Sequence, residues 1–216
     1  MKTITIPTLL RLAEHEALSK VRLTGDVVDL GGDARSGYRT YLTGEYRTTV
    51  VNLDHKARPD VVHDLEEPLP FPDGAFDHAL LINVLEHVYG YRQLLGETAR
   101  ILKPGGSACI VVPFLFPVHP SPQDYWRFTK EALMRECAAA GFTVDRLTPL
   151  GKGLFAARYV MLDRLLPGPL RAITHYSLRY VSGLLDACFT ALAHRLGKRY
   201  DPADYALGYF VHATRR

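Results

Sequence analysis

The sequence predicts an α/β protein in which helices cover both faces of a mostly parallel sheet, with a helical insertion before the last strand. Three observations support this prediction. Short β-branched and apolar segments alternate with helix-like segments along residues 21–149. The first two of these strand-like segments end in glycine or aspartate, where the chain is expected to turn into a loop. Residues 150–200 then become rich in Leu, Ala, Tyr and Arg, and a strand-like pattern returns near the end.

Hydrophobic spacing places the elements along the chain. A first helix is expected over residues 7–20, where leucines recur at helical spacing. Strands are expected over residues 25–31, 48–54, 60–63, 77–83, 107–114, 142–148 and 205–214. A helix over 88–103 is expected to stop at Pro104-Gly105-Gly106, where the chain should turn. After a Pro-rich loop from Phe116 to Asp124, Thr129 is expected to cap a helix that ends at Gly141.

Length and composition indicate one globular domain. The chain has 216 residues, of which 47% are hydrophobic and 23% charged. We expect a core over about 21–149 and 203–216 and a helical insertion over about 150–200. A net charge of +3 does not indicate nucleic-acid binding. No leader or spanning segment is evident, so a cytoplasmic protein is expected, as a monomer or a homodimer.

The cysteines and histidines do not indicate a metal centre. Cys109, Cys137 and Cys188 are widely spaced and odd in number, which argues against a disulfide framework or a zinc site. The histidines and acids lack the i, i+4 spacing that places two ligands on one helix face. We therefore expect no metal.

Polar residues follow the predicted strands at the edge where a parallel sheet binds ligands. The run Asp29–Asp33 ends the first strand, and its glycines allow the backbone to approach a ligand closely. Asp54 ends the second strand, where a carboxylate can accept hydrogen bonds from a ribose. Asp64 follows the third strand and is placed to meet a base amine, and Asn83 ends the fourth. The stretch Asp29–Asp33 alone is equally consistent with a simple turn.

Longer phrases carry a more specific resemblance. The run from Asp64 to Val88 (DLEEPLPFPDGAFDHALLINVLEHV), the following ETARILKPGG and the strand SACIVVPF resemble class I S-adenosylmethionine-dependent methyltransferases of the type 11 branch. With VVDLGG and VVNLD before them, the resemblance covers roughly residues 25–145 in the right order. It implies a Rossmann-like sheet with an antiparallel last strand, and S-adenosylmethionine as the cofactor.

The resemblance also implies roles for individual residues. The methionine end of the cofactor is expected at the first strand's turn, its ribose at Asp54, and its adenine at Asp64 and Leu65. Asn83 and Leu85 are expected to line the methionine part, and Asp77 is expected to be structural. The cofactor residues are therefore Asp29, Gly31, Gly32, Asp33, Asp54, Asp64, Leu65, Asn83 and Leu85.

Asp33 departs from the family pattern, which has glycine there. A carboxylate near the cofactor's own carboxylate repels it. Either Asp33 points away from that group or binding is impaired, and Arg35 or Arg39 is placed to compensate.

The loop after the fifth strand (PFLFPVHPSPQDYWRFT) is expected to face the acceptor, and it resembles a sub-branch associated with bacterial glycan synthesis. A hydroxyl acceptor must lose a proton, and histidine ionises near neutral pH. We therefore expect His119 to be the general base and Asp124 its partner. His87, Tyr125 and Arg127 are expected to contact the acceptor. The competing interpretation is structural: an aromatic clamp, an Arg127–acid pair, and a helix cap at His87.

The insertion has three interpretations. Basic and apolar residues interleave over 154–199. They predict a lid on the sheet, a surface for a membrane or a lipid-linked substrate, or a dimer interface.

The leading functional hypothesis is methylation of a sugar or another small-molecule hydroxyl. A lipid, quinone or natural-product acceptor is the nearest alternative. A degenerate fold that only binds a partner is the alternative of another class, and Asp33 supports it. A nicotinamide oxidoreductase is disfavoured because the G-x-G-x-x-G fingerprint is missing, and nucleic-acid methylation because no basic stripe precedes the insertion.

Overall fold

The computed structural model describes residues 7–163 and 168–216, which belong to two compact units. The sheet unit comprises His15–Pro113, Val118–Thr148 and Tyr209–Arg216. The helical unit comprises Met1–Glu14, Phe114–Pro117 and Pro149–Gly208, and so contains the stretch predicted as an insertion.

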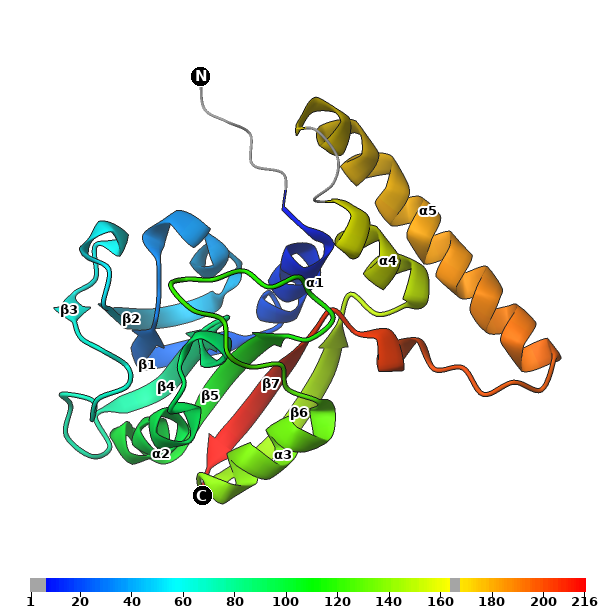
Figure 1. Cartoon of the computed structure of the whole chain (residues 1–216). Coiled ribbons are helices and arrows are strands. Elements are labelled where there is room, and N and C mark those ends of the chain that lie inside the picture. The colour runs from blue at the N-terminus through cyan, green and yellow to red at the C-terminus, as the bar shows by residue number, and fades with distance from the viewer. Residues whose placement is uncertain (1–6, 164–167) are drawn as a thin grey trace. The chain divides into compact units, whose positions relative to one another are not determined.

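A seven-stranded sheet in the order β3-β2-β1-β4-β5-β7-β6 forms the centre of the sheet unit (Figure 1). The strands are β1 (Arg22–Leu30), β2 (Thr43–Asn52), β3 (Val61–Val62), β4 (Phe76–Ile82), β5 (Leu102–Pro113), β6 (Phe142–Leu150) and β7 (Gly208–Arg215). Parallel ladders join β1 to β2 and β4, β2 to β3, and β4 to β5. The arrow of β7 points against that of β6 (Figure 1). The predicted fold is confirmed, and the strand order reverses between β1 and β4.

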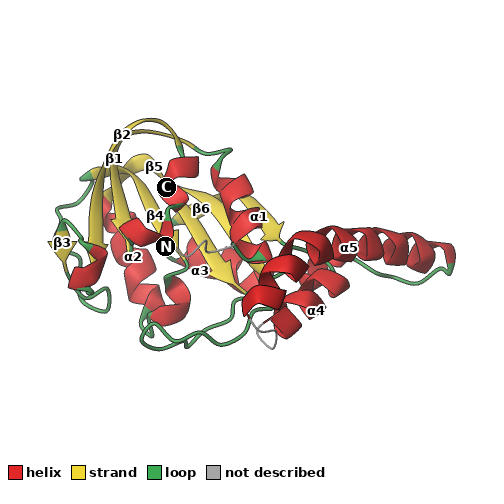
Figure 2. Cartoon of the chain, turned by 90° about the horizontal axis from the view of Figure 1, so that it is seen from above, coloured by secondary structure: helices red, strands yellow, loops and turns green. Residues whose placement is uncertain are grey.

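The described helices are α1 (Leu9–Leu18), α2 (Tyr91–Ile101), α3 (Lys130–Ala139), α4 (Leu154–Asp163) and α5 (Gly168–Arg195). Helices α2 and α3 lie on the same face of the sheet in both views (Figures 1 and 2). As predicted, the Thr129 hydroxyl accepts a hydrogen bond from the Ala132 N–H at 3.2 Å, and Gly141 after α3 has a φ of 93°. The run Pro167-Gly168-Pro169 predicts a break in the helical stretch; Pro167 lies outside the described residues, and α5 begins at Gly168.

The prediction that Pro104-Gly105-Gly106 turns the chain between helix and strand is wrong. Helix α2 ends at Ile101, and β5 begins at the next residue. Leu102 pairs with Phe76, whereas Ser107 pairs with His78, so the glycine run forms an irregularity inside the strand. Leu102 is fully buried, and this burial favours an early start of the strand.

The link between β1 and β2 is two short 3-10 turns, Ala34–Ser36 and Tyr38–Tyr41, rather than a helix. This agrees with the shortness of that stretch in the sequence. Further 3-10 turns are His55–Ala57, Leu85–His87 and Pro202–Tyr205.

The centre of the sheet is apolar on both faces. Val27, Val28 and Leu30 of β1 and Leu80 and Leu81 of β4 are completely buried. Continuous apolar runs are expected of parallel strands covered on both sides, and their burial is the main source of stability.

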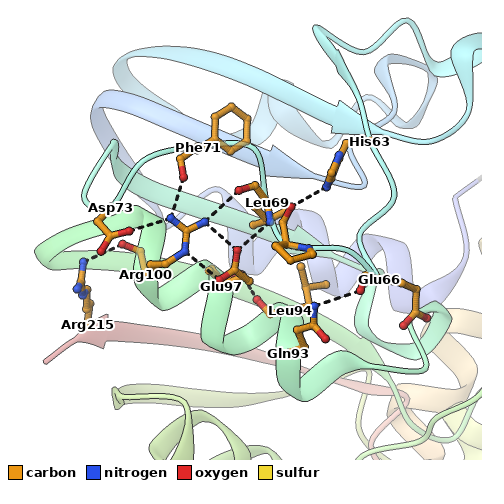
Figure 3. Close-up of polar contacts among 12 residues, drawn as sticks. His63, Glu66, Leu69, Phe71, Asp73, Gln93, Leu94, Glu97, Arg100 and Arg215 are labelled. Atoms are coloured by element: carbon orange, nitrogen blue, oxygen red, sulfur yellow. Dashed lines mark hydrogen bonds and ion pairs between the residues drawn. The ribbon is translucent and has the colours of Figure 1, made fainter.

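Ion pairs and hydrogen bonds of Arg100 stabilise the amino end of the sheet. The guanidinium group of Arg100 on α2 donates to both Glu97 oxygens at 2.8 Å and to Asp73 at 2.8 Å. It also donates to the carbonyl groups of Leu69 at 3.0 Å and Phe71 at 2.8 Å (Figure 3). The phrase LPFPDGAFD is thus held against the helix of ETARILKPGG, so the two phrases that carry the family resemblance are structural here.

The helical unit is organised around a buried carboxylate. Asp186 of α5 is 6% exposed and accepts hydrogen bonds from the N–H groups of Phe155 at 2.9 Å and Ala156 at 3.1 Å. It therefore caps the first turn of α4. The ring of Phe189 packs edge-on against Phe155 and Tyr200.

Large apolar side chains are also exposed on and just after α5. Tyr180, Leu184 and Leu192 of α5, and Leu196 directly after it, are 52–66% exposed. Arg195, Lys198 and Arg199 follow at the end of this helix. Among the described helices, none is long and apolar enough to cross a membrane.

Candidate active site

A cavity of about 530 Å³ opens in the sheet unit at the carboxyl ends of β1, β2 and β4. Its position is the switch point of the strand order, where open α/β sheets bind ligands. The lining residues are Gly31, Asp33, Arg35, Asn52, Leu53, Asp54, Asp64, Leu65, Asn83, Val84, His87, Val88, Ser121 and Pro122. The structure thus brings together Gly31, Asp33, Asp54, Asp64, Leu65, Asn83 and His87 from the predicted site.

The turn after β1 forms the floor of this cavity. Gly31 has a φ of 74°, and a Cβ atom there would lie 2.5 Å from Val84 Cγ2. At Gly32 a Cβ atom would lie 2.4 Å from Asp29 Oδ2. Both positions therefore require glycine, the first for its backbone conformation and for space, the second for space alone.

Asp29 lies beneath the turn and does not line the cavity. Its side chain is fully buried and accepts a hydrogen bond from the Tyr38 hydroxyl at 2.5 Å. Arg39 Nε lies 3.7 Å from Asp29 Oδ2. Burial raises the pKa of Asp29 from 3.8 to about 6, although Tyr38 and Arg39 both act to lower it. Its predicted contact with the cofactor therefore stays a prediction.

Asp33 is neutralised by Arg35, which was one of the two residues expected to compensate it. Asp33 caps the turn Ala34–Ser36 through the Arg35 N–H at 2.8 Å, and the Arg35 Nε lies 2.8 Å from Asp33 Oδ2. These contacts hold the pKa of Asp33 below its usual value. Arg35 also lies 3.6 Å from Asp54 Oδ2, so one guanidinium group connects the two carboxylates.

The remaining acids present oxygens to the cavity. Asp54 is 51% exposed, and its Oδ1 accepts a hydrogen bond from the Lys56 N–H at 2.9 Å. Asp64 is exposed and accepts from the Glu66 N–H at 3.0 Å. Neither side chain is buried among apolar groups, so both are accessible to hydroxyl or amine donors of a ligand.

The segment after β4 adopts a strained backbone. Asn83 has a φ of 54°, an unusual conformation for a residue other than glycine, although asparagine tolerates it. Such residues concentrate at functional sites. Leu85 is fully buried and supports this segment from behind without lining the cavity.

His119 and Asp124 lie together, as predicted. His119 Nδ1 is 3.3 Å from Asp124 Oδ2, and the His119 N–H donates to the same oxygen at 2.9 Å. Arg127 pairs with Asp124 through both terminal nitrogens, at 2.5 and 2.6 Å. The Arg127 guanidinium group lowers the pKa of Asp124 to about 2, so this carboxylate is charged at neutral pH. Arg127 thus pairs with Asp124, as the structural interpretation predicted, and its contact with an acceptor stays a prediction.

Aromatic rings hold the loop after β5 against the start of α2. The Tyr91 ring packs edge-on against Trp126 and Phe128, at centroid distances of 5.2 and 5.0 Å. Tyr125 packs edge-on against Tyr89 at 5.4 Å and is 45% exposed. The structural interpretation predicted an aromatic clamp onto the following helix, α3, whereas these rings pack against residues at the start of α2. The exposure of Tyr125 leaves it accessible to an acceptor.

Comparisons with known proteins agree with this geometry. Residues 34–110 match a protein family described as Methyltransferase domain. A demethylmenaquinone methyltransferase of Listeria welshimeri is 44% identical over 52 residues, 24% of this chain and 22% of that protein. A probable S-adenosylmethionine-dependent methyltransferase of Mycolicibacterium smegmatis is 28% identical over 99 residues, 41% of this chain and 38% of that protein.

Solved structures extend the similarity to the whole fold. An S-adenosylmethionine-dependent methyltransferase from Mesorhizobium loti has a TM-score of 0.58 at 16% identity, covering 94% of this chain and 98% of that one. The chain therefore has the fold of class I S-adenosylmethionine-dependent methyltransferases, and the match to the methyltransferase domain family covers less than half of it. The chain spans only 22% of the length of the Listeria relative and 38% of the Mycolicibacterium relative.

The residues at this cavity fit S-adenosylmethionine, the cofactor of the methyltransferases that this chain resembles. Asp54 and Asp64 offer oxygens for the ribose hydroxyls and the adenine amine. Gly31 leaves a hollow that a Cβ atom would fill. Asp29 Oδ2, buried under the turn, has no hydrogen-bond partner among the described residues.

Two positions at or beside the cavity were not singled out in the sequence. Asn52 Nδ2 donates to the carbonyl groups of Gly31 at 3.1 Å and Gly32 at 3.0 Å, which fixes the glycine turn to β2. Asn52 directly precedes Leu53 and Asp54 at the end of the second predicted strand, and this position could have marked it in the sequence. Glu86 is fully buried beside His87 and His119, which are 32 residues apart in sequence, and only folding reveals this grouping.

Proposed function

We propose that the protein transfers the methyl group of S-adenosylmethionine to a hydroxyl group of a small, sugar- or glycan-related acceptor. One observation carries the proposal: an imidazole–carboxylate pair lies beside the cofactor cavity. His87 lines that cavity, and the ring of His119 lies 5.2 Å from the ring of His87. The loop phrase around His119 supports a glycan-related acceptor.

The cofactor half of the site acts by positioning. When bound, S-adenosylmethionine supplies an electrophilic methyl group. Asp54 binds the ribose hydroxyls and Asp64 the adenine amine, while Gly31 lets the backbone approach the methionine part. Fixing the reacting groups in line contributes several kcal/mol of rate acceleration.

The acceptor half removes the proton. Charged Asp124 accepts from His119 Nδ1–H, which leaves the lone pair of the imidazole on Nε2. Nε2 takes the proton of the acceptor hydroxyl group, and the bound cofactor would supply the methyl group to the acceptor oxygen. Arg127 keeps Asp124 ionised and in place, so it is a positioning residue in this scheme.

The first test is calorimetric titration of the purified chain with S-adenosylmethionine and S-adenosylhomocysteine. We expect micromolar binding that Asp54→Ala weakens about 100-fold, because two hydrogen bonds to a carboxylate are lost. Glu45→Ala is the matched control, since Glu45 is an exposed acid at the opposite end of β2. Absence of binding at millimolar cofactor contradicts the proposal and supports a fold that only binds a partner.

The second test identifies the acceptor. Nucleotide sugars and lipid-linked glycans are screened for methyl transfer, and His119→Gln is compared with the parent on any substrate found. Loss of a general base lowers kcat by about 10²–10⁴-fold. Methylation of oxygen-free acceptors alone would exclude the hydroxyl proposal.

A lipid or quinone acceptor is the second candidate, and the exposed apolar side chains of α5 favour it. Four large exposed apolar side chains along and just after this helix lie close to Arg195, Lys198 and Arg199 in the sequence, and a combination of exposed apolar and basic residues binds anionic lipid surfaces. The partial similarity to demethylmenaquinone methyltransferases points to the same class of acceptor. Sedimentation with phosphatidylglycerol vesicles tests it: we expect binding that Leu184→Asp weakens and Glu45→Ala leaves unchanged. Equal binding to neutral vesicles, or none, argues against an anionic surface.

A further inference from the structure

Glu86, His87 and His119 converge at the edge of the cofactor cavity. Glu86 Oε1 lies 3.7 Å from His87 Nε2 and 3.8 Å from His119 Nε2. One ligand-type atom from each of the three side chains lies within 4.8 Å of the others. All three residues belong to the sheet unit, and His87 lines the cavity.

Both imidazoles are oriented by groups behind them. His87 Nδ1 donates to the Gln123 carbonyl oxygen at 2.5 Å, and His119 Nδ1 faces Asp124 Oδ2 at 3.3 Å. The Nε2 atom of each ring is thereby directed to Glu86. Histidines that bind metals show this arrangement, with the second ring nitrogen donating to a carbonyl or carboxylate group.

Glu86 is the independent observation that points to a ligand. Its side chain is completely buried, and neither of its oxygens has a hydrogen-bond partner among the described residues. An uncompensated buried carboxylate is costly, and such groups are normally paired or bound to metals. The backbone holds Glu86 in place, because its carbonyl group accepts from the Tyr125 N–H at 2.7 Å.

We propose that Glu86, His87 and His119 bind a divalent first-row transition metal ion. Two imidazole nitrogens and one carboxylate are the ligands of catalytic zinc sites and of open non-haem iron sites. Around a tetrahedral ion with bonds of about 2.1 Å, donor atoms lie about 3.4 Å apart. The carboxylate–imidazole distances of 3.7 and 3.8 Å therefore need only a small contraction.

Three protein ligands leave the ion open toward the cavity. A hydroxyl group bound there is polarised and loses its proton to water more readily. His119 is then a metal ligand, and the ion takes over the task of acidifying the acceptor. This consequence rests on the proposed hydroxyl acceptor but replaces His119 as its base, because Nε2 cannot bind the ion and take the proton at once. The metal site itself does not depend on the proposed function.

The test is direct titration of the purified full chain with zinc, cobalt(II) and magnesium chlorides, followed by calorimetry and by the visible spectrum of cobalt. We expect one zinc or cobalt ion per chain and no magnesium binding, because nitrogen ligands suit the former. Glu86→Gln, His87→Gln and His119→Gln should each weaken zinc binding by more than about 100-fold, since even outer partners contribute about 10–100-fold.

Two control variants test whether zinc binds instead to a thiol or to a histidine outside the proposed site. His212 lies 3.1 Å from Asp145 and belongs to no group of three or more metal-ligand side chains found among the described residues, so His212→Gln should bind zinc normally. Cys188 is exposed, and Cys188→Ser should also bind normally. Glu86→Gln keeps the shape of the side chain. His119 is more exposed than Glu86, so His119→Gln is a second variant that should fold, and circular dichroism of both variants checks this.

The possible outcomes are distinct. Failure of the parent chain to bind zinc or cobalt overturns the metal site, as does zinc binding that survives all three ligand substitutions. Loss of binding in Cys188→Ser overturns it as well. Cofactor titration of the same sample separates the proposals: binding of cofactor without metal removes only the metal site, and binding of metal without cofactor removes only the proposed function.

Discussion

Asp77 and Glu86 are carboxylates near the two ends of the same segment, and their surroundings differ. Asp77, at the amino end of β4, accepts from Lys103 Nζ at 2.7 Å and from the Asp26 N–H at 2.9 Å, and these contacts lower its pKa. Glu86, past the carboxyl end of β4, is fully buried without a hydrogen bond to its carboxylate among the described residues.

The contrast extends to the two ends of the sheet. At the amino end, the polar groups of Asp77 and Arg100 are satisfied within the protein and stabilise the fold. At the carboxyl end, Asp29, Asn83 and Glu86 carry unsatisfied oxygens or a strained backbone. A polar group left unsatisfied costs stability, so its persistence points to a ligand. Predictions that separate stability from ligand binding test this division.

The largest effect is expected at Arg100. Arg100→Ala removes five hydrogen bonds of a side chain that is 31% exposed and leaves Glu97 without its cation, so we expect a loss of about 3–4 kcal/mol in the free energy of unfolding. Arg92→Ala is the control: Arg92 also pairs bidentately from α2, with Glu136, but it is 73% exposed and should cost under about 1 kcal/mol. Urea denaturation measures both. Equal losses for the two variants would contradict the larger contribution of Arg100 to stability.

Asp29 is expected to make stability depend on pH. Its pKa is about 6 in the folded protein against 3.8 for the free group. Because the folded pKa is raised, the contribution to stability is complete below about pH 4 and is lost as the pH rises through about 6, by about 3 kcal/mol in total.

The comparison for Asp29 is the Asp29→Asn variant, which keeps an acceptor for Tyr38 but cannot ionise. Between about pH 4 and pH 7, the free energy of unfolding of the parent should fall by about 3 kcal/mol relative to this variant. Urea denaturation across this pH range provides the measurement. Parallel pH profiles for the two proteins would contradict the prediction and show that the pKa of Asp29 is not raised by folding.

Gly31→Ala is expected to cost about 2 kcal/mol and to weaken cofactor binding. The added Cβ must adopt a φ of 74° and lies 2.5 Å from Val84 Cγ2. Gly37→Ala separates the two causes, because Gly37 has a φ of 69° and nothing within 4 Å of its Cβ position. It should show only the backbone cost of about 1 kcal/mol. If the two substitutions have the same effect in thermal unfolding, the close approach to Val84 is unimportant.

The smallest effect is expected at Asp33. Arg35, its partner, is 62% exposed, and exposed ion pairs contribute under about 1 kcal/mol. Asp33→Gly should therefore change the affinity for S-adenosylmethionine less than about fivefold. A much larger gain in calorimetric affinity would mean that Asp33 impairs the site despite Arg35.

The order of strands and helices could be predicted from the sequence, because the spacing of apolar residues and the positions of turn residues are local properties of the chain. That Asp54, Asp64 and Asn83 lie together at one cavity was predictable, because the carboxyl ends of parallel strands meet at one edge. The pairing of His119 with Asp124 was also predictable, since only five residues separate them.

The pairing of polar groups could be seen only in the folded structure. There Arg127 pairs with Asp124, and Arg35 lies between Asp33 and Asp54. The structure also shows that Pro104-Gly105-Gly106 lies inside β5. It also joined Glu86 and His87 to His119 across two loops. These outcomes depend on burial and on contacts between segments far apart in the chain, which the local pattern of residues does not encode.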